Sequence, residues 1–334
     1  MIRSLKPLER WGRKTAAAVF SPVSRSDSRV LPPSPRRILV SRTDSRLGNL
    51  VMLEPLLRSL EERFPSAMVE VLASHVFAEI VELMGFNVIK ADKKGQLRNP
   101  FEFAELVRRL RYDRYDVVID AGHPHSFSLS GAVLAAISGA CCTVSTDVGE
   151  SAKWYTHLVK EPPADWHESR AIHHLGSLWG NWPAWTPPSL KPRRGVTVRN
   201  AIGVHVGASG GKKYPAAKMK KLVEVLSERH FVEIYWGNEN EGREAFEIVS
   251  ECNAAMMPNL TLEDLVEKIA GLKTFVTADN GPMHVAAALS IPVVAIFRVD
   301  DAHRFGPMSP GSRVLFDPAG PEPAKVAEAV FELL

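Results

Sequence analysis

Short runs of branched apolar residues alternate with helical segments from residue 37 onwards. Such runs occupy 37–41, 68–74, 87–92 and 116–122, and a weaker one at 141–146 is a candidate fifth strand. Amphipathic helical patterns separate them, for example at 50–64 and 101–112. Strands that are apolar throughout are typical of a parallel sheet covered by helices on both faces. The predicted fold class is therefore α/β.

The same alternation returns after a segment, from about 150 to 200, in which it is lost. The second set of predicted strands lies at 201–207, 232–237, 273–279 and 292–297. Because 334 residues exceed one core of ordinary size, we predict two doubly wound domains in series. Their ligand crevice should lie outside the carboxyl ends of the strands. The predicted parts are an N-terminal domain at 37–185, a linker at 186–200 and a C-terminal domain at 201–334.

Residues 1–36 form a basic leader. Residues 1–38 hold nine Lys or Arg against Glu9 and Asp27, a local net charge of +7. Two interpretations stay open: the leader lies on an anionic membrane surface, or it is a solvated tail. The longest apolar run, Gly131–Cys142, is far shorter than the ~20 residues that span a bilayer. Only three cysteines are present, so a cytoplasmic protein, soluble or peripheral on a membrane, is expected.

A polar turn follows the predicted strand at 273–279. Pro282 suits the first turn of a helix, since its missing N–H would be unpaired there anyway. The amides of Gly281 and Met283 are expected to be exposed, and a helix start favours an anion. His284 could donate to a phosphate, and Asp279 could cap the helix or hold a hydroxyl. The alternative is a plain capping aspartate and an interface histidine. The predicted anion site comprises Asp279, Asn280, Gly281, Pro282, Met283 and His284.

The stretch "DNGPMHVAAALSIPVVAIF" resembles the donor-site signature of glycosyltransferase family 9, the bacterial heptosyltransferases, with Asn280 at the hydroxyl position. Other stretches resemble the same family in the same order. They are "SRTDSRLGNLVMLEPLLRSLEERFP", "DVVIDAG", "GKKYP", "YWGNENEGREA" and "NLTLEDLVEKIAGLKTFVTADNG". The resemblance spans residues 37–334 and excludes the leader.

This resemblance implies a GT-B architecture, with two facing Rossmann-like domains and a central cleft. It implies a nucleotide-sugar donor on the C-terminal domain and a lipid-linked saccharide acceptor on the N-terminal one. The implied reaction is inverting transfer of a heptose from an ADP-sugar to a lipopolysaccharide core, without a required metal. The cytoplasmic face of the inner membrane is the implied place of action.

The resemblance also implies roles for residues of the C-terminal domain. Lys212 would contact the phosphates, and Lys213 is the other candidate for this role. The alternative is that both lysines are solvated on the surface. Glu241 would accept the ribose hydroxyls, or it is an acid at a helix start that interacts with the helix dipole. Asp279 would contact the sugar or order its loop.

The family's usual catalytic aspartate is replaced by Asn49, which follows Gly48. An amide has no ionisable form at neutral pH and cannot act as a base. Three hypotheses remain: Asp44 accepts the proton instead, transfer proceeds slowly without a strong base, or the protein is a catalytically silent nucleotide-sugar-binding protein. We favour an active transferase with Asp44 as the base.

Polar residues near the ends of the first and fourth strands are candidate acceptor contacts. Guanidinium groups match phosphate in a bidentate fork, and the histidines could donate to an acceptor. No Cys or acidic cluster accompanies the histidines, so neither a metal nor a cofactor is expected. Scattered bases with few aromatics give no nucleic-acid site. The candidates are Arg42, Arg46, His123 and His125.

Overall fold

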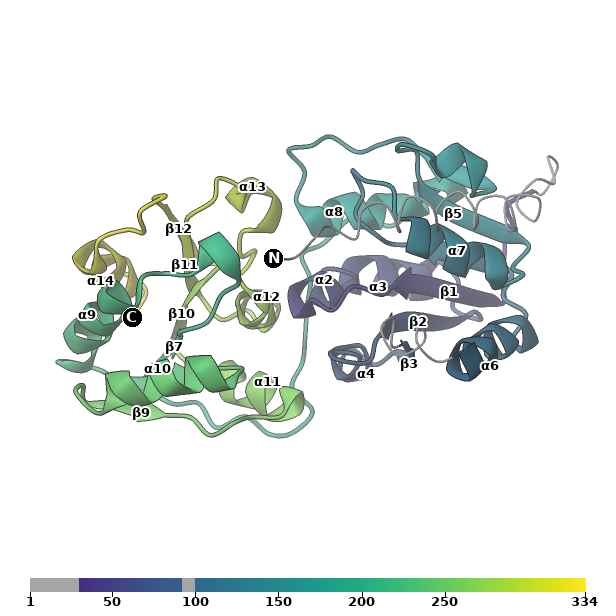
Figure 1. The fold of residues 1–334 in the computed structure, drawn as a ribbon. Helices are drawn as coiled ribbons and strands as arrows, with labels where there is room; N and C mark the ends of the chain where they lie inside the picture. Colours follow the sequence, from purple (N-terminus) through teal and green to yellow (C-terminus); the bar gives the residue numbers. More distant parts are fainter. Residues whose placement is uncertain (1–29, 92–99) are drawn as a thin grey trace, which may run out of the picture.

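A computed structural model describes residues 30–91 and 100–334, so most of the basic leader lies outside the described residues. The first of its two sheets is parallel, with six strands in the order β3-β2-β1-β4-β5-β6. The strands are β1 (Arg37–Arg42), β2 (Met68–Ser74), β3 (Asn87–Ala91), β4 (Val117–Asp120), β5 (Cys142–Thr146) and β6 (His157–Val159). We call this sheet and its helices the N-terminal half (Figure 1).

The helices of the N-terminal half follow the predicted pattern with one interruption. Instead of one helix at 50–64, the chain forms two, and Pro55 stands in the first turn of the second. Proline lacks an N–H and clashes with the preceding turn, which ends the first helix. The helices are α2 (Leu47–Val51), α3 (Glu54–Arg63), α4 (Glu79–Leu83), α6 (Pro100–Tyr112), α7 (Leu129–Ile137) and α8 (Glu168–His173), with 3-10 turns η2 (Ser151–Lys153) and η3 (His174–Trp179).

The second sheet repeats the topology of the first. Its order is β12-β11-β10-β7-β8-β9, so in both halves the first and fourth strands pair at the centre. The predicted doubly wound α/β class is therefore confirmed. The strands of this C-terminal half are β7 (Ala201–His205), β8 (Phe231–Tyr235), β9 (Ala254–Met256), β10 (Thr274–Ala278), β11 (Val293–Phe297) and β12 (Arg313–Phe316).

The helices of the C-terminal half begin at strand ends and return over the sheet. They are η4 (Gly210–Lys212), a single 3-10 turn, and α9 (Ala216–Ser227), α10 (Glu239–Val249), α11 (Leu262–Ala270), α12 (Gly281–Ala288), α13 (Ala302–Phe305) and α14 (Pro323–Phe331). Small residues let α12 lie close to the sheet, and most of its side chains are buried. Within the described residues, no helix combines the length and the apolar character needed to cross a membrane.

Three strands were not predicted: β6, β9 and β12. Each is only three or four residues long, and each lies at an edge of its sheet. The side chains of β12 are mostly exposed, because an edge strand is covered less than a central one. Short, exposed strands lack the continuous apolar run on which the prediction depended.

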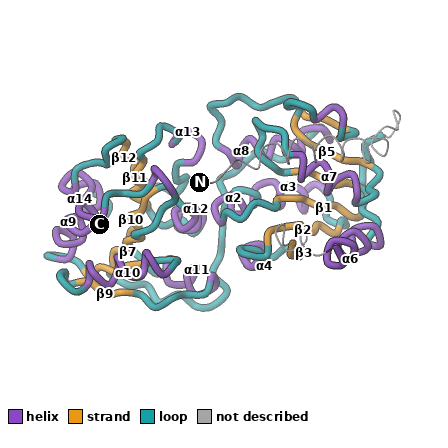
Figure 2. Tube along the Cα trace, viewed as in Figure 1, coloured by secondary structure: helices purple, strands orange, loops and turns teal. Residues whose placement is uncertain are grey.

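The two halves meet through α2 and α12, which lie side by side between the sheets (Figure 1). The chain crosses from one half to the other as a loop (Figure 2). Within this loop the Leu190 N–H donates to the Ala288 carbonyl oxygen over 2.8 Å, which fixes it to the end of α12. The exact domain limits remain a prediction.

Candidate functional site

The predicted site residues lie at the carboxyl ends of β1, β4, β7, β8 and β10, in the turns that follow them or in the first turns of the next helices. In each half the strand order reverses between the two central strands, β1 and β4 in one and β7 and β10 in the other. Ligands of open α/β sheets bind at such switch points. Because α2 follows β1 and α12 follows β10, the packing of these two helices brings one switch point against the other.

Two glycines allow this close approach. A side chain at Gly48 would overlap the ring of His284, and one at Gly281 would come too close to Leu47. The His284 ring is therefore buried against the N-terminal half. The candidate donor loop and the loop that carries Asp44 and Asn49 are neighbours for this reason.

Lys212 is the lysine that faces the donor loop. Its ammonium group donates to Asp279 and, over 3.1 Å, to Asp301 at the start of α13. Lys213 points elsewhere and pairs with Glu244 of α10. Of the two candidate lysines, only Lys212 contacts Asp279, the residue that follows β10.

The charges around Lys212 influence one another. Burial alone would lower the pKa of Lys212, but its ion pairs with two carboxylates outweigh burial, and the pKa is raised. Burial also raises the pKa of the Asp279 carboxyl, while the ion pair with Lys212 acts in the opposite direction. Arg46, across the junction of the two halves, is close enough to favour the charged form of Asp279.

The start of α12 differs from the prediction in one respect. Asn280 caps the helix, and its side-chain oxygen accepts the N–H of Met283 over 3.0 Å. The expected exposure of the Met283 amide is therefore wrong, because the cap already occupies it, and Asp279 is not the cap. Gly281 retains a first-turn N–H, whereas Pro282 has none.

The side-chain amide of Asn280 joins β10 to the turn after β7. It donates to the Gly207 carbonyl oxygen over 2.6 Å and to the Thr277 hydroxyl over 2.7 Å. Glu241 lies against Gly207, where a side chain would overlap its carboxylate, and it accepts the Gly237 N–H over 2.8 Å. The Glu241 carboxylate thus stands at the carboxyl ends of β7 and β8, beside the donor loop.

Asp44 is held by two donors. The Nε of Arg42 lies 2.6 Å from one carboxylate oxygen, and the Asn49 amide donates to the other over 2.8 Å. The side chain of Asp44 remains 36% exposed. Asn49, which cannot take a proton, orients a carboxylate that can.

Arg42 is not placed as an acceptor contact. Its side chain is only 2% exposed and donates to the Ala121 carbonyl oxygen over 2.7 Å, as well as to Asp44. The prediction that Arg42 meets an acceptor phosphate is therefore wrong for this conformation, because its guanidinium ties β1 to β4. Arg46 is exposed at the start of α2, so the predicted acceptor contact stays open for it.

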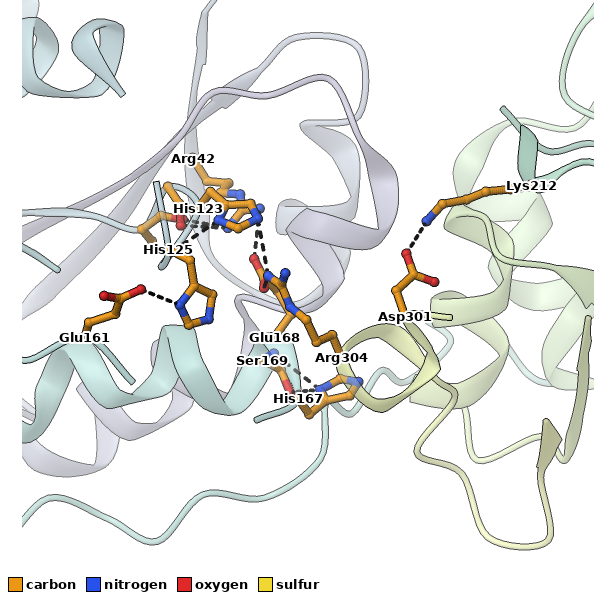
Figure 3. A network of polar contacts seen from close by, with 12 residues as sticks. Arg42, His123, His125, Glu161, His167, Glu168, Ser169, Lys212, Asp301 and Arg304 are labelled. Atoms are coloured by element: carbon orange, nitrogen blue, oxygen red, sulfur yellow. Dashed lines mark hydrogen bonds and ion pairs between the residues drawn. The ribbon is translucent and has the colours of Figure 1, made fainter. Parts of the chain in front are cut away.

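His123 and His125 follow β4 and belong to a wider polar network (Figure 3). The Nε2 of His123 lies 3.2 Å from Arg304, and the Nδ1 of His125 lies 2.9 Å from Glu161. Burial lowers the pKa of His123, which keeps the ring neutral and able to accept from Arg304. Their predicted contact with an acceptor remains untested.

Among the residues of this network that the sequence did not predict are Glu168, Asp301 and Arg304. Asp301 comes four residues after β11, and the rule that sites follow the carboxyl ends of strands would have found it. Glu168 and Arg304 pair across 136 positions of sequence, and no local pattern marks either of them. Within residues 30–91 and 100–334, no group of three or more His, Cys, Asp or Glu is placed to hold a metal ion.

The buried His284 predicts a pH-dependent stability. Burial, with help from neighbouring positive charges, lowers the pKa of His284 to about 3, whereas an unfolded histidine titrates near 6.5. Below about pH 6.5 the unfolded chain therefore binds a proton that the folded chain excludes, and stability falls as the pH falls. Between pH 7 and 5.5 this histidine should cost about 1 kcal/mol of unfolding free energy.

Urea unfolding of the wild type and of the His284→Gln variant at pH 7 and 5.5 measures how much His284 contributes to the loss of unfolding free energy. The loss of stability on acidification should be smaller in the variant by about 1 kcal/mol. His303→Gln is the matched control, because His303 is exposed. Equal pH dependence of wild type and His284→Gln would contradict the burial argument.

Comparison with known proteins finds a family model that matches the C-terminal part of the chain. A model described as glycosyltransferase family 9 (heptosyltransferase) matches residues 191–334. Lipopolysaccharide heptosyltransferase 1 of Pseudomonas aeruginosa is 33% identical over 102 residues, 30% of this chain and 26% of that protein. This match spans about a quarter of that relative. Lipopolysaccharide heptosyltransferase 3 of Escherichia coli is 23% identical over 280 residues, 76% of this chain and 81% of that protein.

Among solved structures, E. coli heptosyltransferase WaaC with ADP has the same fold. The TM-score is 0.77 at 18% identity, over 89% of this chain and 100% of that chain. At this identity the likeness concerns the fold alone, and it confirms the predicted GT-B architecture.

Proposed function

We propose that this chain is a glycosyltransferase, because residues 191–334 match the model of glycosyltransferase family 9. It takes a sugar from a nucleoside-diphosphate donor and transfers it to an acceptor of the cell envelope. The donor binds the C-terminal half, and the acceptor binds the N-terminal half.

The observation that carries this proposal is the packing of α2 on α12. This packing brings the partly exposed carboxylate of Asp44 to the same junction as Lys212 and Asp279. The loop after β1, which carries Asp44, is far in sequence from the loops that carry Lys212 and Asp279. A transferase needs this combination, because the acceptor must lose a proton at the moment when the leaving group gains charge.

The proposed reaction is a single displacement. The acceptor hydroxyl oxygen forms a bond to the anomeric carbon, the bond from that carbon to the diphosphate oxygen breaks, and Asp44 takes the hydroxyl proton. Configuration at the carbon inverts. Lys212 and the Gly281 amide meet the charge that develops on the diphosphate, and a cation on a fixed side chain can do this without a metal.

The finer identity of the substrates comes from the relatives. Those of P. aeruginosa and E. coli are named lipopolysaccharide heptosyltransferases, and the WaaC structure was solved with ADP. We propose ADP-heptose as the donor and a lipopolysaccharide core or a related lipid-linked glycan as the acceptor. Such an acceptor would bring the protein to the cytoplasmic face of the inner membrane, with the basic leader as the contact.

A second candidate is a silent nucleotide-sugar-binding protein. Asn49 favours it, because the family's usual base is absent at this position. The arrangement of Asp44 between Arg42 and Asn49 favours activity instead.

Titration calorimetry with ADP, UDP and GDP tests the donor. We expect ADP to bind most tightly, and we expect ADP-heptose to be hydrolysed slowly or transferred when an acceptor is present. Binding of ADP without hydrolysis or transfer would select the silent binder. Failure of all three nucleotides to bind would contradict both candidates.

A further inference from the structure

Glu168 is a carboxylate buried where the two halves meet, and its side chain is only 1% exposed. It does not cap its own helix α8, because the His167 ring accepts the Ser169 N–H there. A buried carboxylate costs several kcal/mol of solvation unless cations compensate it. Glu168 therefore depends on its two arginine partners (Figure 3).

The first partner belongs to the C-terminal half. Arg304 of α13 lies 2.7 Å from one oxygen of Glu168. The same short helix begins after Asp301, which pairs with Lys212. His167, next to Glu168, lies 3.1 Å from the Gly306 carbonyl oxygen and makes a second contact between the halves. The position of α13 thus links the candidate phosphate lysine to Glu168.

The second partner belongs to the N-terminal half. The terminal nitrogen Nη2 of Arg42 lies 3.9 Å from the other oxygen of Glu168, while its Nε holds Asp44. Arg42 is buried, and its Nη1 also donates to the carbonyl oxygens of Ala121 and Gly122, so Glu168 is the partner of Nη2 alone. The orientation of Asp44 therefore depends on Arg42, and the placement of Arg42 depends in part on Glu168.

We propose that Glu168 and Arg304 are positioning residues for the transfer reaction, which hold Arg42 and Asp44 in place only when α13 is docked on the N-terminal half. The candidate base then becomes correctly oriented when the two halves close around the donor. This coupling rests on the proposed glycosyltransferase function and goes beyond it, since neither residue touches the reacting atoms.

The kinetic test compares Glu168→Gln, Arg304→Gln and the double variant in the full chain. We expect each single change to lower kcat about 10- to 100-fold while the Kd for ADP stays within about twofold. The double variant should lose no more than the worse single one, because both changes break one coupled unit. Wild-type kcat in the single variants, or losses that multiply in the double variant, would overturn the proposal.

Glu70→Gln is the matched control. Glu70 is a buried carboxylate of the same half, paired with Arg37 over 3.0 Å, but it lies on β2 away from the junction. We expect Glu70→Gln to lower the melting temperature and to leave kcat unchanged. An equal loss of kcat in Glu70→Gln would show a general effect of lost stability and would overturn the positioning role.

A crystal structure of Glu168→Gln with ADP gives a readout that needs no turnover. We expect Arg304 to leave this position and the 2.6 Å contact between Arg42 and Asp44 to be lost. Retention of both contacts would overturn the inference even if the wild type is active. A wild type that transfers no sugar would instead refute the proposed function, and the structure would still decide whether the two arginines depend on Glu168.

Discussion

Asp44→Asn is expected to lower kcat by about 100-fold or more, with little change in the Kd for ADP. A positioned general base contributes roughly 10²- to 10⁴-fold, and the asparagine cannot take the acceptor proton. The size of Asn matches Asp, but its single side-chain oxygen can replace only one of the two carboxylate oxygens that accept from Arg42 and Asn49. Initial rates of sugar transfer, with nucleotide affinity measured in parallel, check this result.

The exchange variant Asp44→Asn with Asn49→Asp is the sharpest control. It keeps one carboxylate and one amide within hydrogen-bond reach, 2.8 Å apart in the wild type, and moves the carboxylate to the position that the family uses. We expect it to recover part of the lost rate. Unchanged turnover in Asp44→Asn would assign the proton to another group and leave Asp44 as a structural residue.

Much of this architecture could be predicted because its signals are local. The central strands β1, β4, β7 and β10 are continuous apolar runs, so they stood out in the sequence. A site at a switch point is built from residues directly after such strands, and Asp279 was predicted in this way, whereas Lys212 and Asp44 were predicted from the resemblance to glycosyltransferase family 9. Pro282 predicted the start of α12, because proline lacks the N–H that would be unpaired in the first turn of a helix.

The remaining features depend on contacts that no local pattern records. Asp279 and Asn280 are both able to cap a helix, and only the exact end of β10 decides that Asn280 does so. The burial of Arg42 results from β1 pairing with β4, and its partner Ala121, directly after β4, lies 79 positions further along the chain. Glu168 gains its role from Arg304, which reaches it only after both halves have folded and docked.

Lys212→Met is expected to weaken ADP binding by about 100-fold or more and to abolish measurable transfer. In the wild type this ammonium group forms ion pairs with both Asp279 and Asp301. Without it, an incoming diphosphate meets two carboxylates and loses its cation, and losing one partner of such charge pairs costs about 2–5 kcal/mol. A cost of about 3 kcal/mol corresponds to about 100-fold in Kd. Calorimetry with ADP measures the change.

Two further variants separate this cause from a general loss of positive charge. Lys213→Met removes the adjacent lysine, which pairs with Glu244, and should change the Kd for ADP by less than about threefold. Lys212→Met with Asp301→Asn removes one of the two uncompensated carboxylates and should recover part of the affinity. If Lys213→Met weakens binding as much as Lys212→Met, the phosphates are held by the lysine pair as a diffuse charge, and the assigned contact of Lys212 with the diphosphate is wrong.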